Sequence, residues 1–331
     1  AGRHKQPAGH GRSGHAATGH GSRPPTGYHD RRMRWYDLPG ALALTALAFL
    51  SVFFTYTGFG HSWDEALYLK GAESAADWTR RAAAGDATML GADEIARHWG
   101  KRADGDDPLH PEVGPVPKLA TGFGISQLTA RGFDPMVASR LPVAVAFALT
   151  VALLYWMGVR AYGRVGGTAA ALMYALIPRV FGHAHIAASE TLLAFFTVLT
   201  VAAFLAALRR PWMAVFTGIA FGLAVATKVT ALVLPLPLIL WGQLYHRRDY
   251  ASSVFAMVFV APLVALALWP WMWAGTALRF LEYDRTLSEL GGGPYSGIGD
   301  RSVLGNVATD RNGNYIFRFT LSIADLINEI D

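Results

Sequence analysis

The sequence contains no cysteine, so neither a disulfide framework nor a thiolate metal site can form. It is also poor in charge: 16% of its 331 residues are charged, against the ~25% usual for soluble domains, while 52% are hydrophobic. The hydrophobic residues gather in long runs, at 39–60 and 141–275, with only short polar breaks. A soluble domain builds its core from amphipathic helices or alternating strands, not from segments that are apolar on every face. The composition therefore indicates a membrane protein.

The N-terminal segment has the opposite character, because it is rich in Gly, His, Arg, Ser and Pro. Such a segment cannot bury enough apolar surface to become ordered, so residues 1–35 are predicted to be a disordered basic tail. Its histidines could bind a metal ion, but a solvated tail is the favoured interpretation. No small-residue cleavage site follows the first apolar run. That run is therefore predicted to be a retained transmembrane helix, at 39–57.

Length determines the next crossings. Residues 141–158 match the ~20 residues that one crossing requires. Residues 166–208, as one helix, would be roughly 65 Å long at ~1.5 Å per residue, about twice the ~30 Å hydrocarbon thickness. This stretch must fold back, and the polar segment 179–190 is the natural turn. The stretch 211–241 is also too long for one crossing, and Lys228 marks its predicted turn.

A last span covers 252–273 and ends in tryptophans of the kind that favour the membrane–water interface. The sequence thus predicts an all-α polytopic transmembrane bundle of about seven spans within residues 36–275. A polar tail, 276–331, follows on the outer face, and we expect it to be truncated or aberrant.

Orientation follows from the basic residues, which mark four connections on one side of the predicted bundle. They are Arg31, Arg32 and Arg34 in the tail and the pairs Arg160/Arg164, Arg209/Arg210 and Arg247/Arg248. The positive-inside rule makes that side cytoplasmic, which predicts an integral plasma (inner) membrane protein with a cytoplasmic N-terminus. The loop 58–140 then lies on the outer face.

The outer loop has a helical stripe of small, apolar and aromatic residues. They are Ala66, Leu67, Leu69, Ala72, Ala75, Ala76 and Trp78. The stripe predicts an amphipathic juxtamembrane helix that lies on the membrane surface or, equally, packs against the bundle.

Six ionisable residues on the outer face lie against helix ends: Asp64, Glu65, Glu190, Arg140, Arg179 and Lys228. Ionisable groups at membrane depth are costly and by default indicate a functional site. Cations of this kind can hold a lipid-linked phosphate while a carboxylate handles a proton. The alternative for each residue is a simpler role. A cation can snorkel to the headgroups, Glu190 can favour its helix dipole, and Asp64 and Glu65 can be ordinary loop charges.

Four segments in order resemble motifs of the GT-C glycosyltransferases, in particular the protein O-mannosyltransferases and the aminoarabinose transferases of lipid A. Residues 61–69, His-Ser-Trp-Asp-Glu-Ala-Leu-Tyr-Leu, resemble the acidic motif of the first outer loop. Residues 110–118 are similar to the His-Pro-Pro-Leu-x-Lys-like stretch before the second span, except that Glu112 replaces a proline. Residues 179–190 resemble the second outer loop, and 222–228 the Gly-x-x-x-x-x-Lys end of a later span. Family members generally have more spans than the seven predicted here.

The resemblance implies a function: transfer of a sugar from a polyprenyl-phosphate carrier to a hydroxyl acceptor, a protein or a lipid or glycan, with inversion. It implies Asp64 as the catalytic base, Glu65 as a supporting acid and Glu190 as a residue that orients the acceptor or a cation. The implied substrate-binding residues, which stabilise the leaving phosphate, are Lys228, Arg179, Arg140, His183, His185, His110 and Lys118.

No cofactor is required by this interpretation, although a divalent metal between Asp64 and Glu190 is an alternative. Two other functions stay open: a transporter, or a non-catalytic protein that binds the lipid phosphate. Transporters usually show internal repeats with broken helices near the midplane, and the sequence shows no such repeat. No nucleic-acid partner is expected.

Overall fold

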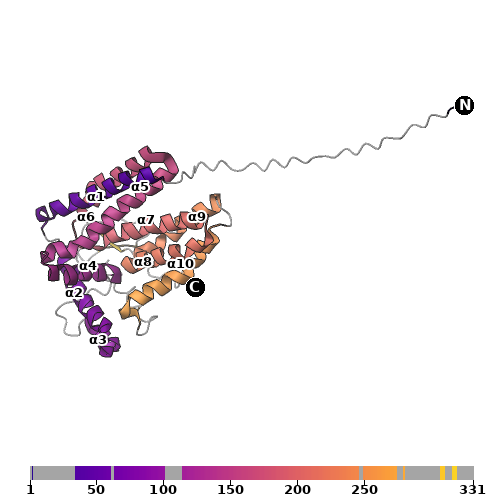
Figure 1. The fold of residues 1–331 in the computed structure, drawn as a ribbon. Helices are drawn as coiled ribbons and strands as arrows, with labels where there is room; N and C mark the ends of the chain where they lie inside the picture. Colours follow the sequence, from indigo (N-terminus) through magenta and orange to yellow (C-terminus); the bar gives the residue numbers. More distant parts are fainter. Residues whose placement is uncertain are drawn as a thin grey trace.

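The computed structural model describes Gly2, residues 34–60, 63–100, 114–245 and 249–273, Arg279, and residues 306–309 and 315–318. Most of the predicted N-terminal tail, Arg247, Arg248 and His110 therefore lie outside the described residues. Figure 1 shows the long helices lying roughly side by side, with α2, α3 and α4 gathered at one end of the bundle.

Four helices are long and apolar enough to cross a membrane: α1 (Leu38–Thr55), α5 (Pro135–Leu176), α7 (Ser189–Ala207) and α10 (Ala251–Leu268). Two shorter apolar helices, α8 (Ala214–Thr227) and α9 (Pro235–Tyr245), lie between α7 and α10 in the chain. The predicted helical membrane bundle is confirmed for this part of the chain, with four to six spanning candidates.

The longest helix, α5, consists of two segments that fold back on each other at Gly163. Gly163 has φ 81° and ψ −175°, a conformation that essentially only glycine adopts without strain. The two segments touch closely, because a Cβ placed on Gly158 would lie 2.6 Å from the Cα of Gly167. Further along, the rings of Phe147 and Tyr174 stack with centroids 5.8 Å apart. This reversal separates the predicted span 141–158 from the stretch that follows it.

The other predicted turns are also found. The second segment of α5 leads into α6 (Pro178–His183), and α7 begins six residues later, so the chain reverses within 179–190 as expected. Helix α8 ends at Lys228, whose backbone is extended, before the short helix η6 (Val229–Val233) and α9. Proline at position 235 and the extended Lys228 together separate what would otherwise be one overlong helix.

Packing contacts fix the directions of the helices. Tyr56, after α1, donates its hydroxyl to the carbonyl of Arg140 at 3.0 Å, so α1 runs antiparallel to the first segment of α5. Helices α8 and α10 are parallel, because Gly218 packs on Ala256 and Gly222 on Ala261.

These directions place the helix connections at two ends of the bundle. We call one the arginine end, formed by residues 34–38, 160–166, 207–214, 245 and 249–251. The other is the carboxylate end, formed by residues 56–60, 63–65, 135–140, 177–190, 227–229 and 269–273. All five described arginines of the predicted cytoplasmic connections lie at the arginine end: Arg34, Arg160, Arg164, Arg209 and Arg210.

A layer of helices covers the carboxylate end: α2 (Trp63–Ala83), η3 (Ala87–Leu90), α3 (Ala92–Trp99) and α4 (Pro115–Leu128). Helices α2 and α4 approach closely, because a Cβ on Gly122 would lie 2.4 Å from the carbonyl oxygen of Ala72. The predicted stripe on α2 packs inward, with Ala75 and Trp78 in a cluster with Met89, Ile95, Trp99, Trp269, Trp271 and Met272. The described part of the stripe therefore packs against protein, as the second of its two predicted roles requires.

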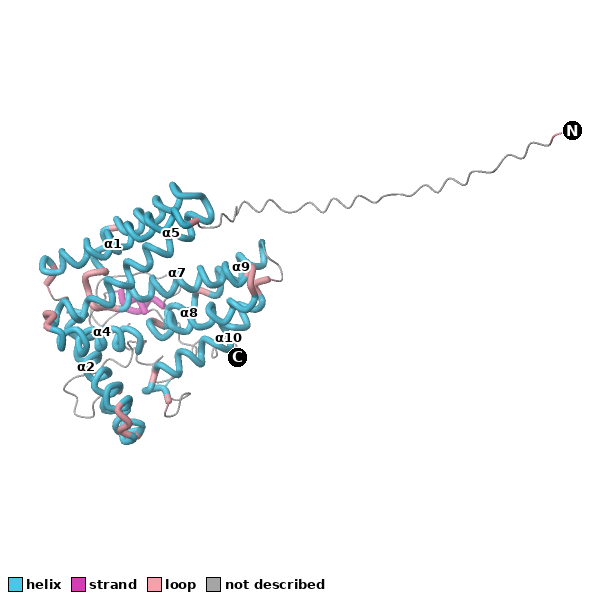
Figure 2. The backbone as a smooth tube through the Cα atoms, in the orientation of Figure 1, coloured by secondary structure: helices cyan, strands magenta, loops and turns pink. Residues whose placement is uncertain are grey.

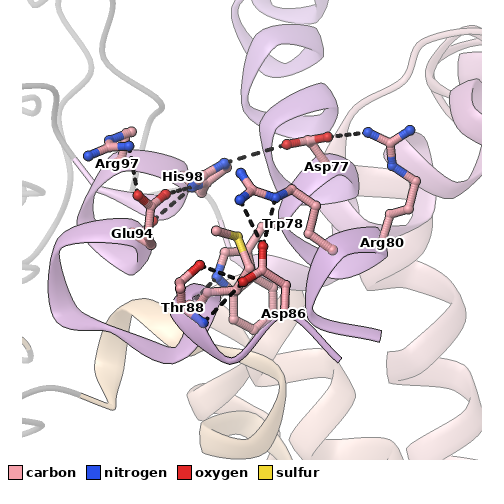
Figure 3. Close-up of polar contacts among 10 residues, drawn as sticks. Asp77, Trp78, Arg80, Asp86, Thr88, Glu94, Arg97 and His98 are labelled. Atoms are coloured by element: carbon pink, nitrogen blue, oxygen red, sulfur yellow. Dashed lines mark hydrogen bonds and ion pairs between the residues drawn. The ribbon is translucent and has the colours of Figure 1, made fainter. Parts of the chain in front are cut away.

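Polar contacts fasten the α2–α3 turn, as Figure 3 shows. The indole of Trp78 donates to the carbonyl of Met89 at 2.8 Å, and Arg81 pairs with Asp86 at 2.8 Å. His98 lies between Glu94 of its own helix and Asp77 of α2, with nitrogen–oxygen distances of 3.5 and 3.7 Å. These contacts hold α3 against α2.

After residue 275, the structure also describes one short strand pair within an otherwise all-α fold. Strands β1 (Asn306–Thr309) and β2 (Tyr315–Arg318) form an antiparallel pair, seen in magenta in Figure 2, with Val307 opposite Phe317. Aromatic and β-branched residues favour strands, and the intervening Asn312-Gly313 dipeptide is a strong hairpin signal. Local sequence preference thus outweighed the helical character of the rest of the chain.

The fold-back of α5 gives a test. Gly158→Ala places a Cβ against the backbone of the second segment, so we expect a loss of about 1–3 kcal/mol of stability, visible as a lower melting temperature in detergent. Gly182→Ala is the matched control, because a Cβ there meets nothing within 4 Å. Equal melting temperatures for the two variants would contradict the close packing of the two segments.

Candidate active site

The centre of the carboxylate end is a buried ion pair between Glu65 of α2 and Arg140 of α5. Arg140 donates from Nε to Glu65 Oε1 at 2.7 Å and from Nη2 to Oε2 at 2.6 Å, and both side chains are fully buried. This two-pronged geometry is the strong form of an arginine–carboxylate pair. Because an unpaired buried charge is very costly, each residue depends on the other.

The pair also ties three chain segments together. Arg140 donates to the carbonyl oxygens of Phe59 at 2.9 Å and Gly60 at 2.8 Å, just after α1. The backbone N–H of Ala187, just before α7, donates to Glu65 Oε1 at 3.0 Å. The structure thus places Arg140, a predicted substrate-binding residue, inside the protein, where its donors are engaged by protein oxygens. Glu65 acts in the same way, as a link between α2 and two other segments.

His185, another predicted substrate-binding residue, is also enclosed. Its ring stacks on Phe59 with centroids 4.1 Å apart, and Nδ1 lies 2.8 Å from the carbonyl oxygen of Phe181. Nε2 lies 2.7 Å from the hydroxyl of Thr55. Burial lowers the pKa of His185, and the positive charge of Arg140 lowers it further. His185 is therefore neutral near pH 7, when it donates from Nδ1 and accepts at Nε2, and it supplies no charge to a substrate.

The partly exposed charges are Glu190 and Lys228. Lys228 Nζ donates to Glu190 Oε1 at 3.0 Å, and the side chains are 45% and 38% exposed, respectively. The hydroxyl of Ser189 donates to the same carboxylate oxygen at 3.2 Å. An ion pair with this exposure gains little from its own attraction, because water screens it. Either group can therefore exchange its partner for a ligand at modest cost.

Contacts between neighbouring segments link the Glu190–Lys228 pair to Glu65 and to the start of α4, which carries Lys118. Ala187, which binds Glu65, precedes Glu190 by three residues. Gly114, which opens α4, lies against the carbonyl oxygens of Ala226 and Thr227, next to Lys228. Lys118 follows one turn into α4 and is buried, being 3% exposed.

The remaining predicted residues have different positions. Arg179 is exposed on α6, and His183, at the end of α6, is half-buried. Asp64 lies in the first turn of α2, directly before Glu65, but its side chain lies outside the described residues, as does the whole of His110. Within the described part of the chain, no group of three or more metal-binding side chains gathers, and a metal between Asp64 and Glu190 stays a prediction.

An apolar cavity of about 430 Å³ lies beside these charges, between α8, η6, α9 and α10. Its walls include Phe221, Val225, Val229, Ile239, Met257 and Leu266. Val229, which lines the cavity, directly follows Lys228 in the chain. A cavity with such walls accepts a hydrocarbon chain and little else. Sequence reasoning missed this cavity, because the packing of the helices, and not a local sequence pattern, decides where a space is left between them.

Sequence reasoning also missed two supporting groups, the backbone N–H of Ala187 and the hydroxyl of Tyr56. Neither carries a sequence signal, since any residue has a backbone N–H and the tyrosine reads as part of an apolar run. Burial raises the pKa of Tyr56, so this hydroxyl stays protonated as the donor to Arg140.

Comparisons with known proteins add a family to this geometry. Residues 121–273 match the family model described as dolichyl-phosphate-mannose-protein mannosyltransferase. No curated protein and no solved structure matches the chain. The match covers α5 to α10, the helices that supply Arg140, Glu190, Lys228 and the apolar cavity. Residues 121–273 are therefore similar to the dolichyl-phosphate-mannose-protein mannosyltransferase family, a GT-C family of membrane glycosyltransferases that use a polyprenyl-phosphate mannose donor.

Proposed function

We propose that the chain transfers mannose from a polyprenyl-phosphate carrier to a hydroxyl group of a protein, with inversion at the anomeric carbon, at the carboxylate end of the bundle. The observation that carries this proposal is the adjacency of the exposed Glu190–Lys228 pair and the apolar cavity that begins at Val229. A cation next to a hydrocarbon-lined space fits the two parts of a lipid phosphate.

Donor binding follows from this adjacency. The polyprenyl chain lies in the cavity between α8, α9 and α10, and its phosphate meets the ammonium group of Lys228. Glu190 holds Lys228 in place at 3.0 Å before the donor arrives, and afterwards orients the cation or the acceptor. The phosphate gains negative charge as it leaves, so a cation fixed beside it lowers the barrier. In this proposal the exposed Arg179 on α6 adds a second positive charge.

The proton is taken by Asp64 in this proposal. The acceptor oxygen attacks the anomeric carbon, the bond from that carbon to the phosphate oxygen breaks, and the acceptor proton passes to the carboxylate. The products are the mannosylated protein and the free polyprenyl phosphate. Attack from the side opposite the phosphate inverts the anomeric centre. General-base help of this kind typically contributes 10²–10⁴-fold in rate.

Glu65 and Arg140 serve as positioning residues in this mechanism. Their pair joins α2 to the start of α5 and, through Ala187, to the segment that leads into Glu190. Asp64 precedes Glu65 on α2, so the pair fixes where its backbone lies relative to Glu190. Distortions of about 1 Å at such a site can cost ~10²-fold in rate.

The membrane face is also a proposal. The positive-inside rule applied to the arginine end makes that end cytoplasmic, which places the carboxylate end on the outer face. This agrees with the donor chemistry, because a lipid-linked sugar serves where soluble nucleotide sugars are absent.

The second candidate function is binding of the lipid phosphate without transfer of its sugar. The apolar cavity favours it, because a cavity can hold a lipid chain whether or not a sugar is transferred. Radiolabelled polyprenyl-phosphate mannose separates the two when it is supplied with an acceptor peptide to the purified chain. Label in the peptide indicates the transferase, whereas bound label that stays on the lipid indicates the second candidate.

Asp64→Asn tests the base. We expect kcat to fall by about 10²–10⁴-fold, because the amide cannot take the acceptor proton, with little change in melting temperature. Glu73→Gln is the matched control on the same helix, since Glu73 is exposed. Full activity in Asp64→Asn would overturn the assignment.

Glu65→Gln tests the positioning role. We expect a loss of stability of roughly 3–5 kcal/mol, because Arg140 is left buried without its counter-ion. Glu65→Asp keeps the charge but shortens the reach, so it should retain most of the stability while kcat falls and the donor KM changes little. Unchanged kcat in a folded Glu65→Asp variant would contradict positioning.

Lys228→Gln tests donor binding. We expect kcat/KM for the donor to fall by more than tenfold, with partial recovery in Lys228→Arg, because the phosphate needs a positive charge at this position. Stability should change by less than about 1 kcal/mol, as for other exposed ion pairs. A normal kcat/KM for the donor in Lys228→Gln would place the phosphate elsewhere.

A further inference from the structure

The arginine end carries a charged cleft that the proposed transfer reaction does not use. It lies between the first segment of α5 and the end of α7, and its lining includes Trp156, Met157, Arg160, Leu205, Ala206 and Arg209. Arg160 is held over the indole of Trp156, with its guanidinium carbon 4.8 Å from the ring centroid. Two arginines from different helices therefore flank one cleft with an apolar floor.

The surroundings of this cleft are positively charged and interfacial. Among the described residues of the arginine end, five arginines stand against two aspartates, Asp37 and Asp249. Asp37 is engaged by Arg164, which donates to it at 2.7 Å. Large exposed aromatic and apolar residues, Tyr162, Val165 and Trp212, lie on the neighbouring connections. This combination is typical of a surface at the level of lipid headgroups.

We propose that this cleft binds the phosphate of an anionic phospholipid from the leaflet at the arginine end. The enclosed part of the cleft is small, about 10 Å³, which is room for a single oxygen-sized group. One phosphate oxygen would enter between the helices while the arginines contact the others from the rim. Basic pockets between transmembrane helices are suited to such headgroups.

A lipid, not a free phosphate, is the ligand that the cleft fits. Met157, Ala202 and Leu205 give it an apolar floor that acyl chains can cover, and the helices on both sides belong to the membrane bundle. The occupied site would link α5 to α7, which supply Arg140 and Glu190 at the opposite end. The site itself does not depend on the transfer reaction.

The test measures binding of a fluorescent phosphatidylglycerol to the purified full chain in neutral detergent. Phosphatidylcholine with the same acyl chains is the lipid control, and soluble glycerol phosphate is the competitor. We expect Arg160→Gln and Arg209→Gln each to weaken phosphatidylglycerol binding about fivefold. Arg210→Gln is the matched control: it removes the same charge at the same end but does not line the cleft.

The site is supported if the two cleft variants bind phosphatidylglycerol more weakly while Arg210→Gln binds it about as tightly as the unaltered chain. Equal weakening in all three variants would show that only the diffuse positive charge attracts the lipid, and would overturn the proposal. Equally tight phosphatidylcholine binding, or displacement of the lipid by glycerol phosphate at similar concentrations, would also overturn it. Arg160→Lys keeps the positive charge, so it should retain part of the affinity for phosphatidylglycerol. This variant therefore distinguishes the loss of a charge from a loss of folding.

Discussion

The Glu65–Arg140 ion pair is the interaction on which the carboxylate end depends. Two opposite charges are buried where neither meets water, and the cost of burying them is offset only because their geometry is complete. Arg140 uses its remaining donors on the carbonyls of Phe59 and Gly60, and Glu65 accepts from Ala187. The segment after α1, the start of α5 and the approach to α7 are thereby fixed to one another.

This constraint separates charges that organise the site from charges that are available to a ligand. Arg140 and His185 lie within the protein, one fully paired and the other neutral, and they support the walls of the site. Glu190 and Lys228 are partly exposed and lie beside the apolar cavity. In the proposed reaction the buried set holds the geometry, and the exposed set, with Asp64, meets the substrates.

Much of this arrangement follows from the sequence. The apolar runs and their lengths predict the helices, and the reversals at 179–190 and Lys228 follow because a helix much longer than the bilayer thickness must turn back. The arginines collect at one end because the spans alternate in direction. The acids and cations at the opposite end could therefore be predicted to converge, as Glu190 and Lys228 do.

The sequence could not show which charges would pair. Asp64 and Glu65 are adjacent in the chain, yet positions one apart on a helix point about 100° from each other, so only one can face Arg140. That choice depends on how α2 packs on α4, through the approach of Gly122 to Ala72, which no local pattern encodes. The strand pair after residue 275 was not predicted for a different reason. Its hairpin signal is short, and the prediction followed the helical composition of the rest of the chain.

The most direct test of the account is the stereochemistry of the product. Purified full chain in lipid nanodiscs would be given polyprenyl-phosphate mannose and a peptide rich in serine and threonine, and the anomeric configuration of the product would be determined by NMR. The account predicts a mannosylated peptide whose configuration is opposite to that of the donor, with one polyprenyl phosphate released per mannose transferred. A product that retains the donor configuration, or donor consumed without any mannosylated peptide, would contradict it.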